Sequence, residues 1–167
     1  MPSSATDPLS LDLYHQPGHL IRRAQQIAMQ LFRDALGPDV TPVQYAVLRM
    51  LQEAPGIDQV TLARLVALDT STTADIAARL ESKGWIHREI LPRRQRSLSL
   101  TPEGEAMLAS FVPHVHALRQ RMLSPLEPEE QVEFKRLLHK FVQLHDVGEA
   151  AAASAVLRAE VAEKSCE

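Results

Sequence analysis

Apolar side chains between residues 61 and 100 change their spacing from that of a helix to that of a strand. Leu62, Leu65 and Val66 fall on one helical face, and a second helical stripe follows soon after. From Arg96 to Leu100, apolar and polar residues alternate, which is the period of a half-buried strand. The pattern predicts two short helices joined by a tight turn and followed by a two-stranded ribbon.

The second of these helices has well-defined ends. Asp69 and Thr70 can accept the free amide hydrogens of a first helical turn, and Gly84 suits the left-handed position that closes a helix. The apolar stripe leaves short hydroxylated and charged side chains on the opposite face, where they can enter a groove. The predicted inward residues are Ile76, Ala77 and Leu80, and the outward residues are Ser71, Thr72, Asp75 and Arg79.

An earlier apolar stripe, in residues 17 to 36, is too wide for a helix with one buried face. We expect this helix to be buried on two sides, as a helix shared between two layers would be. The next helix is predicted to begin at the cap Thr41, with Pro42 where a missing amide hydrogen is tolerated. The stripes of the two helices are Leu20, Ile21, Ala24, Ile27, Ala28, Leu31, Phe32 and Ala35, and then Val43, Val47, Leu48 and Leu51.

Two further stripes follow Thr101, and their spacing is that of helices packed against other helices. Pro113 lies inside the first of them and should bend it. A single chain has too little other apolar surface to cover both stripes, so with the first helix they predict a homodimer related by a two-fold axis. The stripes are Leu108, Phe111, Val115, Leu118 and Met122, and then Phe134, Leu137, Leu138, Phe141 and Leu144.

Charge is distributed unevenly along the 167 residues. The net charge of −3 by itself argues against a nucleic-acid-binding protein. From Arg79 to Arg96, however, six Lys or Arg residues stand against two Glu residues, a balance of +4, which leaves −7 for the rest of the chain. Positive charge is therefore concentrated on the predicted second helix and ribbon, as expected of a groove-binding element.

Other functional classes find little support in the sequence. No apolar run approaches the roughly 20 residues of a membrane span, and the N-terminus lacks the features of a signal peptide, so we expect a cytoplasmic protein that does not bind a membrane. His114 and His116 would lie on nearly opposite faces of a helix, which disfavours a metal site. Cys166 lies beside acidic residues, which disfavours a reactive thiolate. No catalytic triad or glycine-rich phosphate loop is present, so we expect neither an enzyme nor a cofactor.

Four segments of the chain, in order, carry a family resemblance: Thr41-Pro42-Val43-Gln44-Tyr45, Leu80-Glu81-Ser82-Lys83-Gly84-Trp85-Ile86, Arg93-Arg94-Gln95-Arg96 and Leu100-Thr101-Pro102-Glu103-Gly104. With these segments, the chain from about residue 15 to residue 145 resembles the MarR family of winged helix-turn-helix regulators. The resemblance implies a mainly α fold in which a two-stranded β wing follows the recognition helix, and N- and C-terminal helices form a dimerisation layer. It also implies a homodimer on a double-stranded, pseudo-palindromic DNA operator.

The wing departs from the family pattern at Pro92, where the family usually has an aspartate before its paired arginines. The acidic brace of the wing arginine is therefore missing from that position, and the wing is about two residues shorter. Arg94 matches the arginine that the family inserts into a groove. The hydroxyl groups could instead be solvated caps, and the arginines an ordinary charged hairpin tip. The DNA-binding candidates are Thr70, Ser71, Thr72, Thr73, Asp75, Arg79, Arg93, Arg94 and Arg96.

The start of the first helix resembles family members that sense hydroxybenzoates or nicotinate derivatives. An arginine beside an apolar stripe can bind a planar carboxylate through two hydrogen bonds while the aromatic ring packs nearby. The alternative is a salt bridge between subunits. The effector-binding candidates are His19, Arg22, Arg23 and Tyr45.

These observations predict a repressor released from its operator by a small aromatic acid. The alternatives are a winged helix that binds proteins without DNA, a MarR-type regulator with another effector, and a small enzyme that uses the histidines. The predicted organisation is an arm over residues 1–16, a dimerisation region over 17–40 and 102–147, a DNA-binding domain over 41–101, and a tail over 148–167.

Overall fold

The computed structural model describes residues 13–90 and 96–144. Pro92, Arg93, Arg94 and Cys166 lie outside this range, so the expectations for these residues stay predictions. The chain divides into two compact units, with the boundary in the sequence between Met122 and Leu123.

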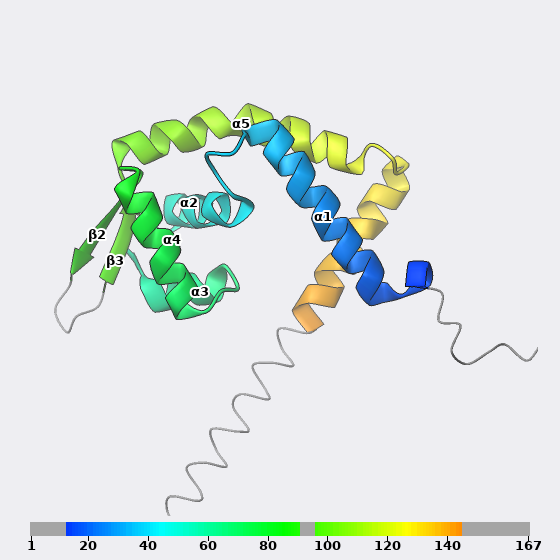
Figure 1. Ribbon diagram of the computed structural model, residues 1–167, viewed down its shortest axis with the longest axis horizontal. Helices are drawn as coiled ribbons and strands as arrows, with labels where there is room; N and C mark the ends of the chain where they lie inside the picture. The colour runs from blue at the N-terminus through cyan, green and yellow to red at the C-terminus, as the bar shows by residue number, and fades with distance from the viewer. Residues whose placement is uncertain (1–12, 91–95, 145–167) are drawn as a thin grey trace, which may run out of the picture. The chain divides into compact units, whose positions relative to one another are not determined.

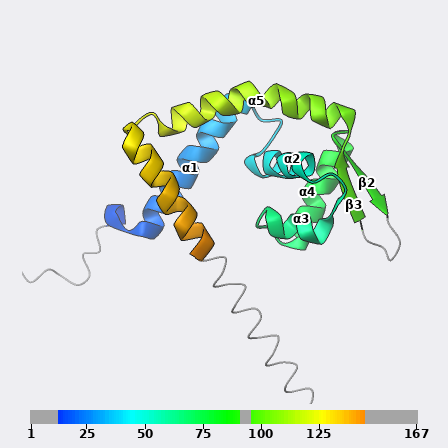
Figure 2. The ribbon, with the colours of Figure 1, turned by 180° about the vertical axis from the view of Figure 1, so that it is seen from behind.

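The first unit contains all the labelled helices and strands (Figure 1). In both views α2, α3 and α4 gather beside the sheet (Figures 1 and 2). The elements are η1 (Leu13–His15), α1 (Pro17–Leu36), α2 (Pro42–Glu53), β1 (Ile57–Asp58), α3 (Gln59–Leu65), α4 (Thr70–Ser82), β2 (Ile86–Ile90), β3 (Arg96–Leu100) and α5 (Pro102–Leu123). In the second unit, residues 128–144 are helical.

The predicted ribbon is the pair of antiparallel strands β2 and β3, in which Ile86 lies opposite Leu100 and Ile90 opposite Arg96. A third strand was not predicted. The two residues of β1 pair with β3 on its other edge and place Ile57 opposite Leu98, which gives the strand order β1-β3-β2. A segment of two residues has no periodicity that a sequence pattern could reveal.

The core of the first unit joins the helices to the sheet. Leu62, Leu80, Leu98 and Leu108 come from four different elements, and each is fully buried. Burying a leucine side chain is worth about 1.5–3 kcal/mol, so these contacts hold α3, α4, β3 and α5 together. The other fully buried apolar residues are Val47, Leu48, Leu51 and Ala77.

The α5 stripe packs on this same core, so one of the two stripes behind the homodimer prediction is covered within the chain. Leu108, Phe111 and Leu118 are buried within the chain, and Trp85 and Tyr45 each make an edge-to-face contact with Phe111. The single chain therefore covers the first of the two predicted stripes. The stripe of the second unit differs, because its apolar side chains are 42–64% exposed: Phe134, Leu137, Leu138, Phe141 and Leu144.

Helix α1 is not buried on two sides within the single chain. Phe32 is buried, whereas Leu20, Ile21 and Ile27 are 50–52% exposed. Near its C-terminal end, Leu31 and Ala35 pack partly against the core. The rest of the predicted stripe faces away from the core of its own unit.

Helices α2 and α3 each begin directly after a capping residue, Thr41 and Asp58. Thr41 and Gln44 form a capping box at α2, as the Thr-Pro start suggested. Helix α3 begins at Gln59, because the Asp58 carboxylate accepts hydrogen bonds from the amides of Val60 and Thr61, both at 3.0 Å.

Two predicted inward residues point outward. Val43 is 37% exposed in α2, and the neighbouring Gln44 is buried because its side chain belongs to the capping box. Leu65 is 51% exposed in α3, and Ala63 is buried in its place. Leu62 and Val66, one turn apart, contact the core as predicted, so the buried face of α3 runs through Leu62, Ala63 and Val66.

Candidate nucleic-acid interface

The N-terminus of α4 is closed by the carboxylate of Asp69. One carboxylate oxygen accepts a hydrogen bond from the Thr72 amide at 2.8 Å, and the other accepts one from the Thr72 hydroxyl at 2.6 Å. The Ser71 hydroxyl donates to the first oxygen. Hydrogen bonds from Ser71 and Thr72 hold the pKa of the Asp69 carboxyl well below its usual range. The cap is therefore ionised at neutral pH, and both hydroxyl groups are held in defined positions.

The candidate residues of α4 divide into five that are accessible to solvent and one, Thr73, that is buried. Thr70, Ser71, Asp75 and Arg79 are exposed, and Thr72 is half-buried. These five lie where a ligand can approach the helix from solvent.

Thr73 belongs to the interior and is removed from the candidate interface. Its side chain is fully buried, and its hydroxyl donates to the Asp69 backbone carbonyl at 2.9 Å. A hydroxyl satisfied by the preceding turn can sit in an apolar core at little cost. The run of four hydroxylated residues from Thr70 to Thr73 concealed this difference, because one position along a helix turns the side chain by about 100°.

Arg96 lies on the ribbon at the start of β3, where its side chain is exposed opposite Ile90. The predicted contacts of Arg93 and Arg94 fall between the described parts of β2 and β3. Within the described residues, the interface therefore consists of the α4 N-terminus and the Arg96 end of the ribbon.

Sequence reasoning missed Arg88, which connects the ribbon to α4. Its Nε lies 2.6 Å from Oε2 of Glu81, and Nη2 donates to the same oxygen. The hydrogen bond and the charge of Arg88 lower the pKa of the Glu81 carboxyl. A signal was available, because a turn at Gly84 brings the last turn of α4 near the first residues of the next strand.

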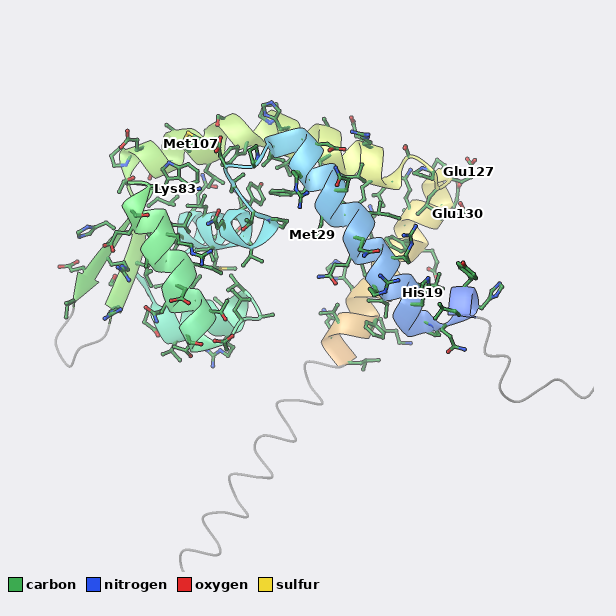
Figure 3. All side chains as sticks on the ribbon, viewed as in Figure 1. His19, Met29, Lys83, Met107, Glu127 and Glu130 are labelled. Atoms are coloured by element: carbon green, nitrogen blue, oxygen red, sulfur yellow. The ribbon has the colours of Figure 1, made fainter. Side chains whose placement is uncertain are left out.

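Lys83 was not a predicted site residue either. Its ammonium lies 4.6 Å from the centre of the Trp85 ring and donates to the Asp39 backbone carbonyl. Figure 3 shows Lys83 near the end of α4. The contact ties α4 to the connection between α1 and α2, which is distant in sequence.

The predicted effector residues are not brought together within the chain. His19 and Arg22 lie near the start of α1, with Nδ1 of His19 3.4 Å from Nη2 of Arg22. Tyr45 packs edge to face against Phe32, near the other end of α1. Arg22 and Phe32 are ten residues apart, which is about 15 Å along a helix. A ligand of one aromatic ring cannot span both groups in one protomer.

A pocket of about 210 Å³ lies near the C-terminal end of α1. Apolar side chains dominate its wall, and Arg33 is the charged residue among them. Figure 3 shows Met29, which also lines it, along α1 beyond His19. Sequence periodicity could not find it, because a non-helical connection supplies half of its wall. The lining residues are Met29, Phe32, Arg33, Gly37, Pro38, Val40, Thr41 and Pro42.

The described residues offer neither a metal site nor a membrane-spanning helix. Residues 13–90 and 96–144 contain no group of three His, Cys, Asp or Glu side chains placed to hold a metal ion. Nδ1 of His114 lies 3.1 Å from the Ser110 carbonyl, one turn earlier in the same helix. None of the helices in these two ranges is both long and apolar enough to cross a membrane.

Comparisons with known proteins give a consistent result. The model of the MarR family matches residues 40–98. The transcriptional regulator HosA of Escherichia coli O111:H- is 38% identical over 107 residues, covering 63% of this chain and 79% of HosA. The transcriptional repressor NicR of Pseudomonas putida is 30% identical over 145 residues, covering 84% of this chain and 92% of NicR. These relatives are regulators, which agrees with the expectation that the chain is not an enzyme.

Solved structures agree with the winged helix-turn-helix prediction. PcaV of Streptomyces coelicolor, solved with its natural ligand, is 34% identical with a TM-score of 0.76, covering 80% of this chain and 96% of PcaV. BpsR of Bordetella bronchiseptica, whose DNA binding is regulated by 6-hydroxynicotinic acid, is 28% identical with a TM-score of 0.73, covering 77% of this chain and 95% of BpsR. The mainly helical fold with its small antiparallel sheet is thereby confirmed.

Proposed function

The chain belongs to the MarR family, and on that basis we propose that it is a cytoplasmic, homodimeric repressor that a small aromatic acid releases from a pseudo-palindromic operator. The observation that carries the DNA-binding part is the α4 N-terminus. Ser71 and Thr72 are held there by the Asp69 cap, beside a ribbon that carries exposed Arg96. Small polar groups at a helix N-terminus suit base edges in a major groove, and a neighbouring arginine suits phosphates.

The charge distribution supports DNA over a protein partner. The balance of +4 between Arg79 and Arg96 stands within a chain of net charge −3. Phosphate contacts release condensed counterions, so a local basic surface is sufficient for binding even when the whole protein is acidic. The wing tip, with Arg93 and Arg94, is proposed to add further phosphate or minor-groove contacts.

The homodimer is proposed from apolar surface that the single chain leaves uncovered. In the first unit, α1 exposes Leu20, Ile21 and Ile27, each half accessible. In the second unit, the helix over residues 128–144 exposes a longer apolar stripe. Contiguous apolar patches on soluble proteins mark interaction surfaces. The proposed partner is a second copy of the chain, because a two-fold symmetric dimer matches the two half-sites of a pseudo-palindromic operator. The N- and C-terminal segments 17–40 and 102–147 would form this layer, and 41–101 the DNA-binding domain.

The proposed effector is a planar aromatic acid, the class to which the 6-hydroxynicotinic acid that regulates BpsR belongs. The pocket beside Arg33 offers both a cation for the carboxylate and an apolar wall for the ring. Arg33 supplies the positive charge, and Phe32, Val40 and Pro42 supply the apolar surface. A cavity of about 150 Å³ is sufficient for benzene, so the available volume suits one substituted ring. His19, Arg22, Arg23 and Tyr45 form a complete site only if the two protomers contribute different members.

The pocket is also placed to affect DNA binding. Lys83, at the end of α4, donates to the carbonyl of Asp39, between the pocket residues Pro38 and Val40. A ligand releases DNA only if it binds the conformation that cannot hold DNA more tightly than the one that can. A ligand that moves the α1–α2 connection would change the contact of Lys83 with Asp39, and with it the position of the recognition helix. Such a ligand would bind the two conformations with different affinities.

The proposal is tested by a gel-shift titration of the full-length protein against the DNA upstream of its own gene. Binding that tightens on a specific fragment, relative to random DNA, supports the proposed function. A protein that binds neither fragment would instead support the protein-interaction alternative.

A further inference from the structure

We propose that the Glu81–Arg88 ion pair positions the ribbon on the recognition helix, and that this position sets the affinity for DNA. The inference rests on the proposed DNA binding and adds two positioning residues to it. Neither residue is assigned a contact with DNA. Each acts through the placement of groups that make contact, such as Arg96 on β3 and Thr72 on α4.

The geometry of the pair suits a brace. Glu81 lies in the last turn of α4, Arg88 lies in the middle of β2, and these two elements lie side by side (Figure 1). Two guanidinium nitrogens share one carboxylate oxygen, which restricts both side chains more than a single contact does. The Arg88 side chain is 22% exposed, compared with 41% for Arg49 and 57% for Arg136, whose ion pairs stay within single helices.

Strand pairing holds the ribbon from one side only, because β1 pairs with β3 at Leu98 and Ser97, whereas β2 is an edge strand of the described sheet. Ile86 is buried, and Arg88 is two residues further out, opposite the fully buried Leu98. At the outer end, Ile90 is 74% exposed and lies opposite exposed Arg96. The contact between Arg88 and Glu81 fixes this edge strand to α4, and so limits how far the β2–β3 pair, with Arg96, can move relative to α4.

The sequence gives an independent reason for a brace at this place. The acidic residue that would brace the wing from within is replaced by Pro92, which has no charge. Glu81 is one of two acidic residues between Arg79 and Arg96, a stretch that also contains six basic residues. Considered as a charge alone, Glu81 opposes DNA binding through repulsion of phosphates. Its orientation toward Arg88 gives it a favourable role.

Loss of the Glu81 charge and loss of the brace change the affinity for DNA in opposite directions, so the direction of the change in affinity is the test. Glu81→Gln removes one negative charge, so simple electrostatics predicts tighter DNA binding. The brace predicts weaker binding, by roughly tenfold if one charge-assisted contact to phosphate is lost. The matched control is Glu89→Gln, which removes the same charge from an exposed position on β2 outside the ion pair. This control should bind as tightly as the wild type or more tightly.

Salt dependence separates positioning from a purely structural role. If Glu81→Gln displaces one phosphate contact, the slope of log affinity against log salt should become shallower by about 0.9. A loss of fold stability alone lowers the active fraction and leaves the slope of the folded protein unchanged. Gel-shift titrations at several salt concentrations, on protein whose active fraction has been measured, give both quantities.

Arg88→Lys provides a second variant, because it keeps the net charge and removes the two-nitrogen contact. It should also weaken binding, and it decides the question if Glu81→Gln does not fold. The proposal is overturned if Glu81→Gln binds DNA like Glu89→Gln, or if Arg88→Lys binds like the wild type. Failure of the wild-type protein to bind any DNA would instead refute the proposed function, so the two failures are distinguishable.

Discussion

The backbone carbonyl of Trp85 occupies the space that a side chain on Gly104 would need. A β-carbon at Gly104 would overlap the carbonyl oxygen and lie 2.8 Å from the carbonyl carbon. Residue 104 lies in the first turn of α5, and Trp85 directly follows the glycine that closes α4. The backbone of the connection between α4 and β2 therefore lies directly against the first turn of α5.

Gly104→Ala should lower the free energy of unfolding by about 1–3 kcal/mol, because overlap with backbone cannot be relieved by a rotamer change. Urea denaturation monitored by Trp85 fluorescence measures the loss. Gly18→Ala is the matched control, since no atom lies within 4 Å of a β-carbon there and alanine is favoured in a helix. Equal stability of the two variants would contradict the close approach of α5 to Trp85.

The Asp69 cap predicts how stability depends on pH. Its pKa is lowered in the folded protein by hydrogen bonds from Ser71 and Thr72, whereas an unfolded aspartate has a pKa of about 3.9. A lowered folded pKa contributes stability that is fully present above the unfolded value and is lost as pH falls through the folded value. Stability should therefore decline below about pH 4, and Asp69→Asn, which keeps a capping side chain, should reduce the steepness of that decline.

Denaturant titrations between pH 7 and pH 2.5 check this prediction. Asp75→Asn is the charge-matched control, because Asp75 lies in the same helix outside the cap. If the free energy of unfolding of Asp69→Asn and of the wild type fell equally steeply with pH, Asp69 would not be the group responsible for the decline.

Thr72 and Arg96 should affect DNA binding in different ways. Thr72→Ala should lose about 1–3 kcal/mol on the specific operator if the hydroxyl reads a base edge, with a smaller loss on random DNA. Arg96→Ala should weaken both kinds of binding similarly and reduce the salt slope by about 0.9, because phosphate contacts carry no sequence information. Fluorescence anisotropy on both duplexes separates the two, and equal losses for Thr72→Ala would remove it from base recognition.

A planar aromatic acid should raise the melting temperature of the free protein and lower its affinity for the operator. Benzoate, salicylate, hydroxybenzoates, nicotinate and 6-hydroxynicotinate are suitable probes, first by thermal shift and then by gel shift. Arg33→Ala should abolish both responses and leave DNA binding largely intact, since Arg33 lies on α1 away from α4 and the ribbon. Arg22→Ala and Arg23→Ala test the clamp at the start of α1 in the same assays.

Each pattern of responses has its own meaning. Loss of the response in Arg22→Ala or Arg23→Ala, with a normal response in Arg33→Ala, would place the acid at the start of α1. If all three variants respond like the wild type, none of these arginines binds the carboxylate.

Local signals in the sequence were sufficient for much of the fold. Thr41 and Asp69 cap α2 and α4 as predicted, and Gly84, with a φ of 74°, closes α4 in the left-handed conformation. Hydrogen bonds from Gly84 to Glu81 and from Trp85 to Leu80 complete that end. Each of these features depends on residues within one turn of each other, so a single sequence contains the information needed to predict them.

Features that depend on distant residues were not predictable in this way. β1 exists because β3 offers it an edge, and α5 is covered because its apolar face meets the core. The pocket beside Arg33 forms where α1 meets the following connection, and the contact of Lys83 with Asp39 joins residues 44 positions apart. Such relationships arise from tertiary packing, which a hydrophobic pattern does not specify.

The most direct test of the account is a salt titration of operator binding combined with footprinting of the same complex. If each protomer of a dimer places α4 and its ribbon on DNA, log affinity should fall linearly with log salt, by about 0.9 for every phosphate neutralised. Two protected half-sites should then lie about 34 Å apart, one turn of the double helix. A flat salt response, or protection of a single half-site by the intact dimer, would contradict the account.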